Sequence, residues 1–333
     1  MSRTICAPAA HAAALPRLTT TVPREFVHRA AVAEVLLTGW RREGEDRFLV
    51  TAQWPRGHSF FTPVAGAGGR RHDPMLVTET IRQVGSLIAH AEFDVPLGYQ
   101  FLMWDLSVTT HPERLAVGPV PAELVLEVRC SDVRRRAGTL AGLRYDVVLR
   151  RDGAIAATGN ASYTCASPEV YRRLRGNREP GLPTRTAPAV PPELVGRHSS
   201  FDVVLAPAAS PAGGPADASA AGRAGRWLLR AEGDHPVLFD HPVDHIPGMV
   251  LLEAARQASA ALAPAASAVT PASFTSSFHR YAELDLPCWI EAERDEPDAA
   301  GAFVSRVSGH QDGEPVFSCT ITTTPPADPS VCQ

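Results

Sequence analysis

Lysine is missing from this chain of 333 residues, whose 32 cationic side chains are all arginine. A protein without lysine forms no Schiff base with a carbonyl substrate, and it cannot build a P-loop, because both need a lysine amine. Arginine remains available for anions, since its planar guanidinium binds phosphate and carboxylate groups through paired hydrogen bonds.

Zinc-type cysteine spacings and long apolar runs are also absent. The six cysteines include no Cys-x-x-Cys pair, so we expect unpaired thiols, no metal and no cofactor. No run approaches the roughly 18 to 20 apolar residues that cross a membrane, and Pro8 and His11 interrupt the Ala-rich start that a signal peptide would need. With a net charge of −4, we expect a cytoplasmic protein that binds neither membranes nor nucleic acid.

An internal repeat organises the chain. At a constant offset of 174 residues, Met75, Glu79, Arg82 and Gln83 recur as Met249, Glu253, Arg256 and Gln257. His58 and His235 precede these two blocks at comparable positions, and an Asp-Gly pair follows each block at 152–153 and 312–313. Asp-Gly between two strand-like runs is typical of a hairpin turn. The chain therefore consists of two copies of one structural unit.

Each copy is expected to hold one helix among several strands. The helices are predicted from Pro74 to about His90, with Asp73 as N-cap, and from Pro247 to about Leu262. Alternating β-branched and aromatic residues predict strands at 32–38, 48–54, 101–109, 122–130, 140–149, 155–164, 201–205, 226–230, 288–294, 302–308 and 316–323. This order is typical of the hotdog fold. We predict an α+β protein, a tandem double hotdog in which each repeat is a curled antiparallel sheet wrapped around one long helix.

Composition sets the expected boundaries. The first hotdog repeat is predicted at 25–170 and the second at 193–326, joined by a Pro-rich linker at 176–192. An Ala/Pro/Gly stretch at 206–225 is predicted to be a disordered loop within the second repeat.

The repeated Glu-x-x-Arg-Gln places its three polar side chains on one helical face, at spacings of three and four residues. One interpretation is an exposed ion pair on a solvated face. The neighbours of Glu79 on that face, Met75 and Ser86, are not the mixed charges of such a surface. We therefore favour a polar patch inside a cavity, where burial would raise the pKa of the carboxyl and suit it to act as a general base.

Gly248 follows Pro247 at the start of the second helix. A glycine there lets a ligand approach the backbone, and the free N–H groups can stabilise a carbonyl oxygen or oxyanion. The segment from Pro247 to Gln257 resembles the active-site helix of hotdog β-hydroxyacyl thioester dehydratases, with Glu253 at the place of their catalytic acid. Their catalytic histidine would fall on Phe239, so the dehydratase pair is incomplete here.

Longer blocks resemble a different hotdog family. They are His72–Pro74 with Glu79–Gln83, then Gly98–Asp105, then Asp234–Gln257. Over residues 25–325 the chain is similar to the A-factor biosynthesis (AfsA-like) hotdog-repeat family, the synthases of γ-butyrolactone, butenolide and furan autoregulators.

The resemblance implies an acyltransferase that esterifies a β-ketoacyl chain from acyl carrier protein onto dihydroxyacetone phosphate. It would be a first step in making a γ-butyrolactone-type signal. Either carboxylate, Glu79 or Glu253, would take the proton from the attacking hydroxyl, and Arg82 and Arg256 would bind phosphate or hold the carboxylate. Gly248 would stabilise the oxyanion.

Other polar residues have weaker assignments. Gln83 and Gln257 are expected beside the substrate, and His58 and His235 at the pocket mouth, although a structural role for the histidines is the more common outcome. A metal site at His241, Asp244 and His245 is not favoured, because the first repeat has no counterparts.

Two other functions stay open, a hotdog thioesterase or dehydratase acting on acyl thioesters and a non-catalytic acyl- or lactone-binding regulator. Glutamate and arginine in both repeats argue against the regulator. We expect either a monomer with an intramolecular hotdog pair or a homodimer.

Overall fold

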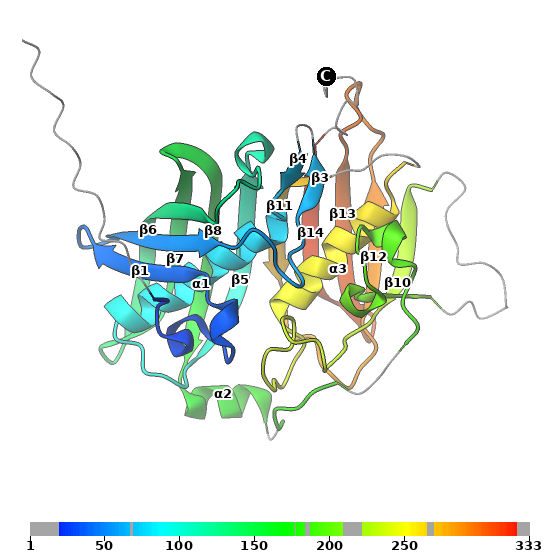
Figure 1. Ribbon diagram of the computed structural model, residues 1–333. Helices are drawn as coiled ribbons and strands as arrows, with labels where there is room; N and C mark the ends of the chain where they lie inside the picture. Colours follow the sequence, from blue (N-terminus) through cyan, green and yellow to red (C-terminus); the bar gives the residue numbers. More distant parts are fainter. Residues whose placement is uncertain are drawn as a thin grey trace, which may run out of the picture.

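The computed structural model describes residues 20–66, 69–176, 178–183, 187–208, 222–264 and 270–324. Twelve strands form one antiparallel sheet (Figure 1). In spatial order the first repeat supplies β1 (Leu37–Arg42), β2 (Arg47–Trp54), β6 (Ala122–Arg136), β7 (Thr139–Arg151), β8 (Ala154–Ala166) and β5 (Gln100–Thr110). The second supplies β11 (Pro271–Phe278), β14 (Glu314–Thr323), β13 (Val304–Gln311), β12 (Trp289–Arg294), β10 (Ala224–Leu229) and β9 (Leu205–Pro207). A separate hairpin joins β3 (Val64–Gly66) to β4 (Gly69–Arg71).

Each half of the sheet carries one long helix, α1 (Pro74–Glu92) or α3 (Gly248–Ala261), and both lie on the same face (Figure 1). Asp73 caps α1 as predicted, by accepting a hydrogen bond from the backbone of Met75, and Pro74 occupies the first turn. A shorter helix, α2 (Pro168–Arg175), follows the first repeat. These observations confirm the predicted α+β double hotdog. No helix in the described part of the chain is long and apolar enough to span a membrane.

The two repeats are joined edge to edge. Strand β5 pairs antiparallel with β11, with Leu106 opposite Ser276 and Val108 opposite Phe274. Within this sheet the hydroxyl of Ser276 also donates to the carbonyl of Leu106 at 2.6 Å. One chain therefore contains an intramolecular hotdog pair, and the region where the repeats meet lies between the two helices.

Both predicted Asp-Gly turns are present. Asp152 and Gly153 have φ values of 52° and 78°, and Asp312 and Gly313 have 52° and 79°. Two successive positive φ values match the right-handed twist of the flanking strands, which for these turns are β7 and β8, and β13 and β14.

Two predicted strands, 32–38 and 201–205, are wrong over most of their length. Each contains a short 3-10 helix, Val32–Glu34 or Ser200–Asp202, and a strand begins only at Leu37 or Leu205. Strand β11 and helix α2 were not predicted. Of the predicted disordered loop 206–225, residues 209–221 lie outside the described residues, and the two ends belong to β9 and β10.

Candidate functional site between the two repeats

Three side chains of the first repeat converge on one buried carboxylate. Glu79, on α1, accepts hydrogen bonds from Nε and Nη2 of Arg82 at 2.8 and 2.7 Å, and from Nε2 of Gln83 at 2.8 Å. Arg29, from the segment before β1, lies 2.6 Å from the same carboxylate. The sequence therefore identified three members of this cluster and missed Arg29.

The second repeat builds the same cluster on α3. Glu253 accepts from Nε and Nη2 of Arg256 at 2.9 and 2.8 Å and from Gln257 at 2.6 Å. Arg197 completes it, with Nη2 at 2.7 Å from the carboxylate and Nε donating at 2.8 Å. The geometry of the helix motif is thus duplicated in full.

Both glutamines hold the backbone in place. Nε2 of Gln83 also donates to the carbonyl of Glu34, and its Oε1 accepts from the backbone N–H of Leu36. In the second repeat Gln257 binds the carbonyl of Asp202 and the N–H of Val204 in the same way. These bonds use backbone groups that a strand would pair, which explains why the predicted strands at 32–38 and 201–205 are interrupted. Gln83 and Gln257 therefore each hold the chain segment that precedes the first strand of their repeat.

The expected rise in the pKa of the two carboxyls is wrong. Burial would raise the pKa of Glu79, but Arg29 and Arg82 outweigh it and hold that pKa at about 2. Arg197 and Arg256 likewise overcome burial and hold the pKa of Glu253 at about 2. Two adjacent guanidinium groups favour the ionised form more strongly than a dry environment opposes it. Both carboxylates are therefore charged anchors near neutral pH.

A second, shorter repeat in the sequence would have revealed the missing arginines. Val27 and Arg29 are matched by Val195 and Arg197 at an offset of 168 residues. The carbonyl of Val27 accepts from Arg82, and the carbonyl of Val195 accepts from Arg256. This offset differs from 174, so a search at one fixed spacing passes over it.

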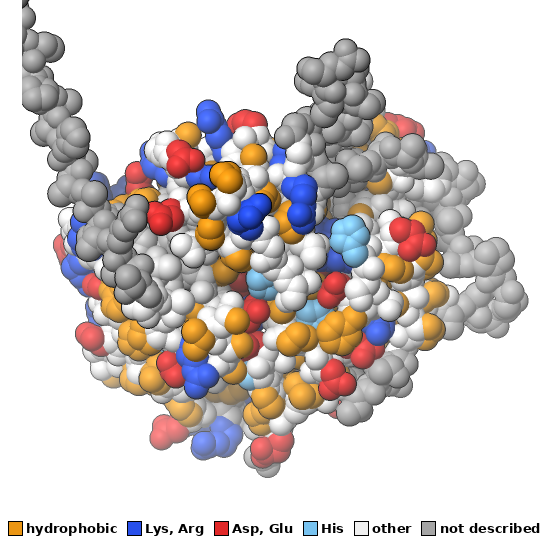
Figure 2. Space-filling view, in the orientation of Figure 1, with side chains coloured by type: hydrophobic (Ala, Val, Ile, Leu, Met, Phe, Trp, Pro, Cys, Tyr) orange, Lys and Arg blue, Asp and Glu red, His pale blue; other side chains and the backbone are white. Residues whose placement is uncertain are grey.

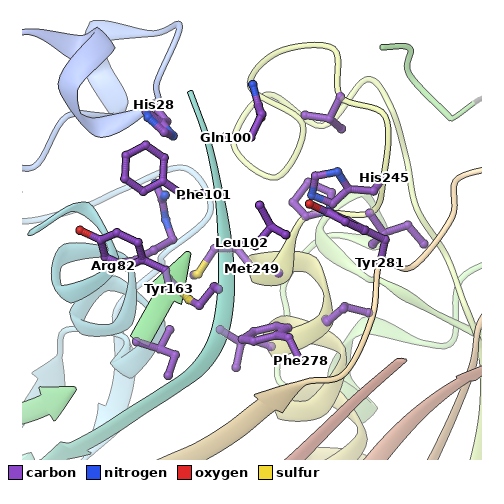
Figure 3. A pocket seen from close by; sticks show the side chains of 18 of the residues that line it. His28, Arg82, Gln100, Phe101, Leu102, Tyr163, His245, Met249, Phe278 and Tyr281 are labelled. Carbon is purple, nitrogen blue, oxygen red and sulfur yellow. The ribbon is translucent and has the colours of Figure 1, made fainter. Parts of the chain in front are cut away.

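One cavity of about 460 Å³ lies between the repeats (Figure 3). The first repeat contributes the guanidinium groups of Arg29 and Arg82, and the second contributes the start of α3 at Pro247 and Gly248. Glu79 and Gln83 lie behind the arginines and do not line the cavity. On the face shown in Figure 2, histidine and acidic side chains gather near the middle, where the two repeats meet.

Most of the cavity wall is apolar. The apolar side chains that line it from both repeats include Phe101, Leu102, Met103, Leu106, Met249, Leu251, Leu252 and Phe278. In Figure 3 Phe101 lies toward His28 and Arg82, whereas Leu102 lies beside Met249. A wall of this kind accommodates an aliphatic chain, whereas the arginines supply a polar end.

The second cluster does not line this cavity and is covered by protein atoms. Nη1 of Arg197 donates to the carbonyl of Phe60 at 2.7 Å and lies 3.4 Å from Asp73, and its guanidinium stacks on the Phe60 ring. The side chain of Arg197 is only 2% exposed, and neither Glu253 nor Arg256 contacts the cavity. The two repeats are therefore equivalent in their clusters but not in their access to a ligand.

The starts of α1 and α3 also differ in what they offer to a ligand. Asp73 and Pro74 stand at the start of α1, so a side chain caps that helix and its first residue has no N–H. At the corresponding positions α3 has Pro247 and Gly248, with no side-chain capping bond at this end. Of these two helix starts, that of α3 has backbone N–H groups with no acceptor among the described residues, and it is the one that lines the cavity.

His58 and His235 share one structural role. Nδ1 of His58 accepts from the backbone N–H groups of Phe60 and Phe61, and Nδ1 of His235 accepts from Val237 and Leu238. Neither histidine lines the cavity. Each holds the turn that precedes the helix of its repeat.

His28 is a cavity residue that the sequence did not single out. It adopts a left-handed backbone conformation, with φ of 53°, where the second repeat has Gly196 with φ of 64°. Its Nε2 lies 2.8 Å from Nε2 of His90, whose Nδ1 bonds the carbonyl of Val95. Burial and the neighbouring charges of His90 and Arg82 lower the pKa of His28 to about 3, so it faces the cavity uncharged.

Fold and site together define a tandem double-hotdog protein with one asymmetric cavity, built from the arginine pair of one repeat and the helix start of the other. The chain belongs to the AfsA family, since the model of the A-factor biosynthesis hotdog domain matches residues 10–167 and 180–326.

Its relatives include proteins named 2-oxo-3-(phosphooxy)propyl 3-oxoalkanoate synthase. The protein from Streptomyces virginiae is 53% identical over 92% of this chain and 98% of its own length. The protein from Streptomyces coelicolor is 43% identical over 90% of this chain and 91% of its own length. Among solved structures, the 12:0-ACP thioesterase from Umbellularia californica has a TM-score of 0.47 and 11% identity, and covers 83% of this chain and 94% of that chain.

Proposed function

We propose that this protein is an acyltransferase that joins a 3-oxoacyl chain to a hydroxyl of dihydroxyacetone phosphate. The product named for its relatives, a 2-oxo-3-(phosphooxy)propyl 3-oxoalkanoate, is the ester of these two components. The reaction would exchange a thioester for an oxygen ester, and we infer that acyl carrier protein delivers the thioester. It would supply the precursor of a γ-butyrolactone-type signal.

The pairing of an apolar wall with arginine side chains at one end carries this proposal. Three arginines line the cavity, Arg29, Arg82 and Arg280. The carboxylates beside the first two are Glu79, which both contact, and Asp240, which also lines the cavity. A phosphate group would accept charge-assisted hydrogen bonds from the guanidinium N–H groups that these carboxylates leave free. The apolar wall around Phe101 and Met249 would hold the acyl chain.

The start of α3 supports the acyl-transfer step. When the hydroxyl adds to the thioester carbonyl, a negative charge develops on the carbonyl oxygen. In the proposal the N–H of Gly248, at the start of α3, stabilises that charge, and the positive end of the helix dipole adds to the effect.

The lowered pKa of both glutamates argues against their acting as the general base. In the proposal Glu79 holds Arg29 and Arg82 toward the cavity. Glu253, Arg256, Gln257 and His235 have no direct part in it, because they do not line the cavity.

The test is mass spectrometry of the purified protein incubated with a 3-oxoacyl carrier protein, or with its short thioester mimic, with and without dihydroxyacetone phosphate. A phosphorylated 3-oxoacyl ester that forms only with both substrates is expected. Free acid or an enoyl product, formed regardless of the phosphate, would identify a thioesterase or dehydratase instead. Binding without turnover would identify a regulator.

A further inference from the structure

A histidine beside a buried aspartate precedes α3, and the proposed function has not used it. Nδ1 of His245 lies 2.7 Å from Oδ1 of Asp244. Asp244 is buried, and it also accepts from the hydroxyl of Tyr171 at 2.7 Å and from Nε of Arg175 at 3.0 Å. Both α2 side chains therefore fix the carboxylate that the imidazole faces.

The environment of Asp244 keeps it ionised. Burial would raise its pKa, but the hydrogen bonds from His245, Tyr171 and Arg175 outweigh burial and hold the pKa well below its usual range. An ionised carboxylate only accepts hydrogen bonds, so Nδ1 of His245 carries the proton. The lone pair of the neutral imidazole is consequently on Nε2.

The imidazole is directed at the cavity. His245 lines it, two positions before Pro247, and its ring packs edge-on against Tyr281 with centroids 4.7 Å apart. Figure 3 places His245 beside Tyr281, on the opposite side of the cavity from His28 and Phe101. Within the described residues, Nε2 of His245 has no hydrogen-bond partner.

We propose that His245 is the general base of the acyl transfer and that Asp244 is its positioning residue, an assignment that rests on the proposed function. Nε2 takes the proton of the attacking hydroxyl while the hydroxyl oxygen bonds to the carbonyl carbon of the thioester. The electron pair of the C=O bond moves onto the carbonyl oxygen, which lies beside Gly248. When this intermediate collapses, the C–S bond breaks. The leaving thiolate receives the proton from the imidazolium of His245. Asp244 stabilises that imidazolium, as the aspartate of a Ser-His-Asp triad does.

Three other histidines line the cavity, His28, His241 and His279, and they fit this role less well. Nε2 of His279 already contacts the hydroxyl of Ser318 at 3.0 Å. His241 stands next to Asp240, but its contact is longer, at 3.1 Å, and its side chain is 43% exposed against 29% for His245. His28 faces the cavity near Arg82, and in the part of the chain that the structure describes no carboxylate contacts it. Its imidazolium would be disfavoured by the same positive charges that attract the phosphate.

The experiment compares His245→Asn and Asp244→Asn with the matched variant His241→Asn, each measured for kcat and KM with a short 3-oxoacyl thioester mimic and dihydroxyacetone phosphate. Loss of a general base costs roughly a hundredfold or more in kcat, and that loss is expected for His245→Asn with KM nearly unchanged. Asp244→Asn disturbs the tautomer of that base, and in a Ser-His-Asp triad this change costs roughly 10⁴-fold in kcat, so the loss for Asp244→Asn should be at least as large as for His245→Asn. His241→Asn should change kcat by only a few-fold.

Chemical rescue separates a base from a structural residue. Added imidazole should restore part of the activity of His245→Ala and none of that of His241→Ala. Suppose that the wild type forms the ester and that the kcat of His245→Asn stays within about threefold of the wild-type value, a change well below the general-base range. This result overturns the role of His245 and leaves the proposed function intact. Wild-type protein that forms no ester overturns the proposed function, and this assignment with it.

Discussion

Arg29 and Glu79 lie fifty positions apart in the chain, and their side chains meet at 2.6 Å, with Nη2 of the arginine against Oε1 of the carboxylate. Arg197 and Glu253 repeat this contact at 2.7 Å in the second half. The helix motif is thus completed in both repeats by an arginine from the segment that enters the domain. In the first repeat this arginine also turns the cluster into the polar end of a cavity.

Replacing the two motif arginines with lysine should have different consequences. Arg82→Lys removes the paired contact of Nε and Nη2 with Glu79 and, with it, the guanidinium group at the cavity, so the KM for dihydroxyacetone phosphate should rise by roughly tenfold or more. Arg256→Lys changes only the covered cluster, so it should lower thermal stability and leave this KM unchanged. Steady-state kinetics and melting curves of both variants provide the check. An equal rise in KM would mean that the second cluster also binds substrate.

Glu253→Gln should destabilise the fold, because it leaves the buried Arg256 without its counter-charge and Arg197 with only the more distant carboxyl group of Asp73. Such a loss costs about 3–5 kcal/mol. The folded pKa of Glu253, about 2, lies below its ordinary value of 4.5. Its stabilising contribution is therefore complete above pH 4.5 and is lost as the pH falls toward 2. Urea unfolding of the wild type and the variant between pH 2 and 7 measures this. The wild type should lose more stability than the variant over that interval, and parallel pH profiles would contradict the assignment.

Gly248→Pro should remove one hydrogen-bond donor with little change to the helix. Proline is compatible with the first helical position, and Pro247 already has φ of −58° and ψ of 143°, which a following proline requires. Loss of an oxyanion donor lowers kcat by roughly a hundredfold or more. Gly248→Ala is the control. Like proline, alanine adds a Cβ at this position, about 3.1 Å from the Phe278 ring, but it keeps the N–H. Equal losses in both variants would assign the effect to the Cβ.

Leu252→Phe should shift the acyl preference toward shorter chains, because Leu252 is buried in α3 and lines the cavity. The larger side chain reduces the volume open to the acyl chain, at a stability cost of about 1–3 kcal/mol. Competition between 3-oxoacyl thioester mimics of different length gives the ratio of kcat/KM values. An unchanged ratio would place the acyl chain elsewhere.

Local features were predictable to the extent that local sequence controls them. Asp73 and Pro74 define the start of α1, and the Asp-Gly pairs define two turns, because capping and positive φ depend on adjacent residues. The segments 32–38 and 201–205 read as strands because of their apolar alternation. They are interrupted because Gln83 and Gln257 bind their backbone from a distant helix, and no local pattern records that competition.

The sequence by itself determined the duplication, the two helices and the Glu-x-x-Arg-Gln face of each, since all of these follow from spacing along the chain. Only the tertiary structure decided which copy meets a ligand. Pairing of β5 with β11 brings the start of α3 to the arginine pair of the first repeat. Phe60 and Asp73 cover Arg197 in the second. Two chemically equal motifs become unequal because access depends on side chains that pack against them from the other repeat.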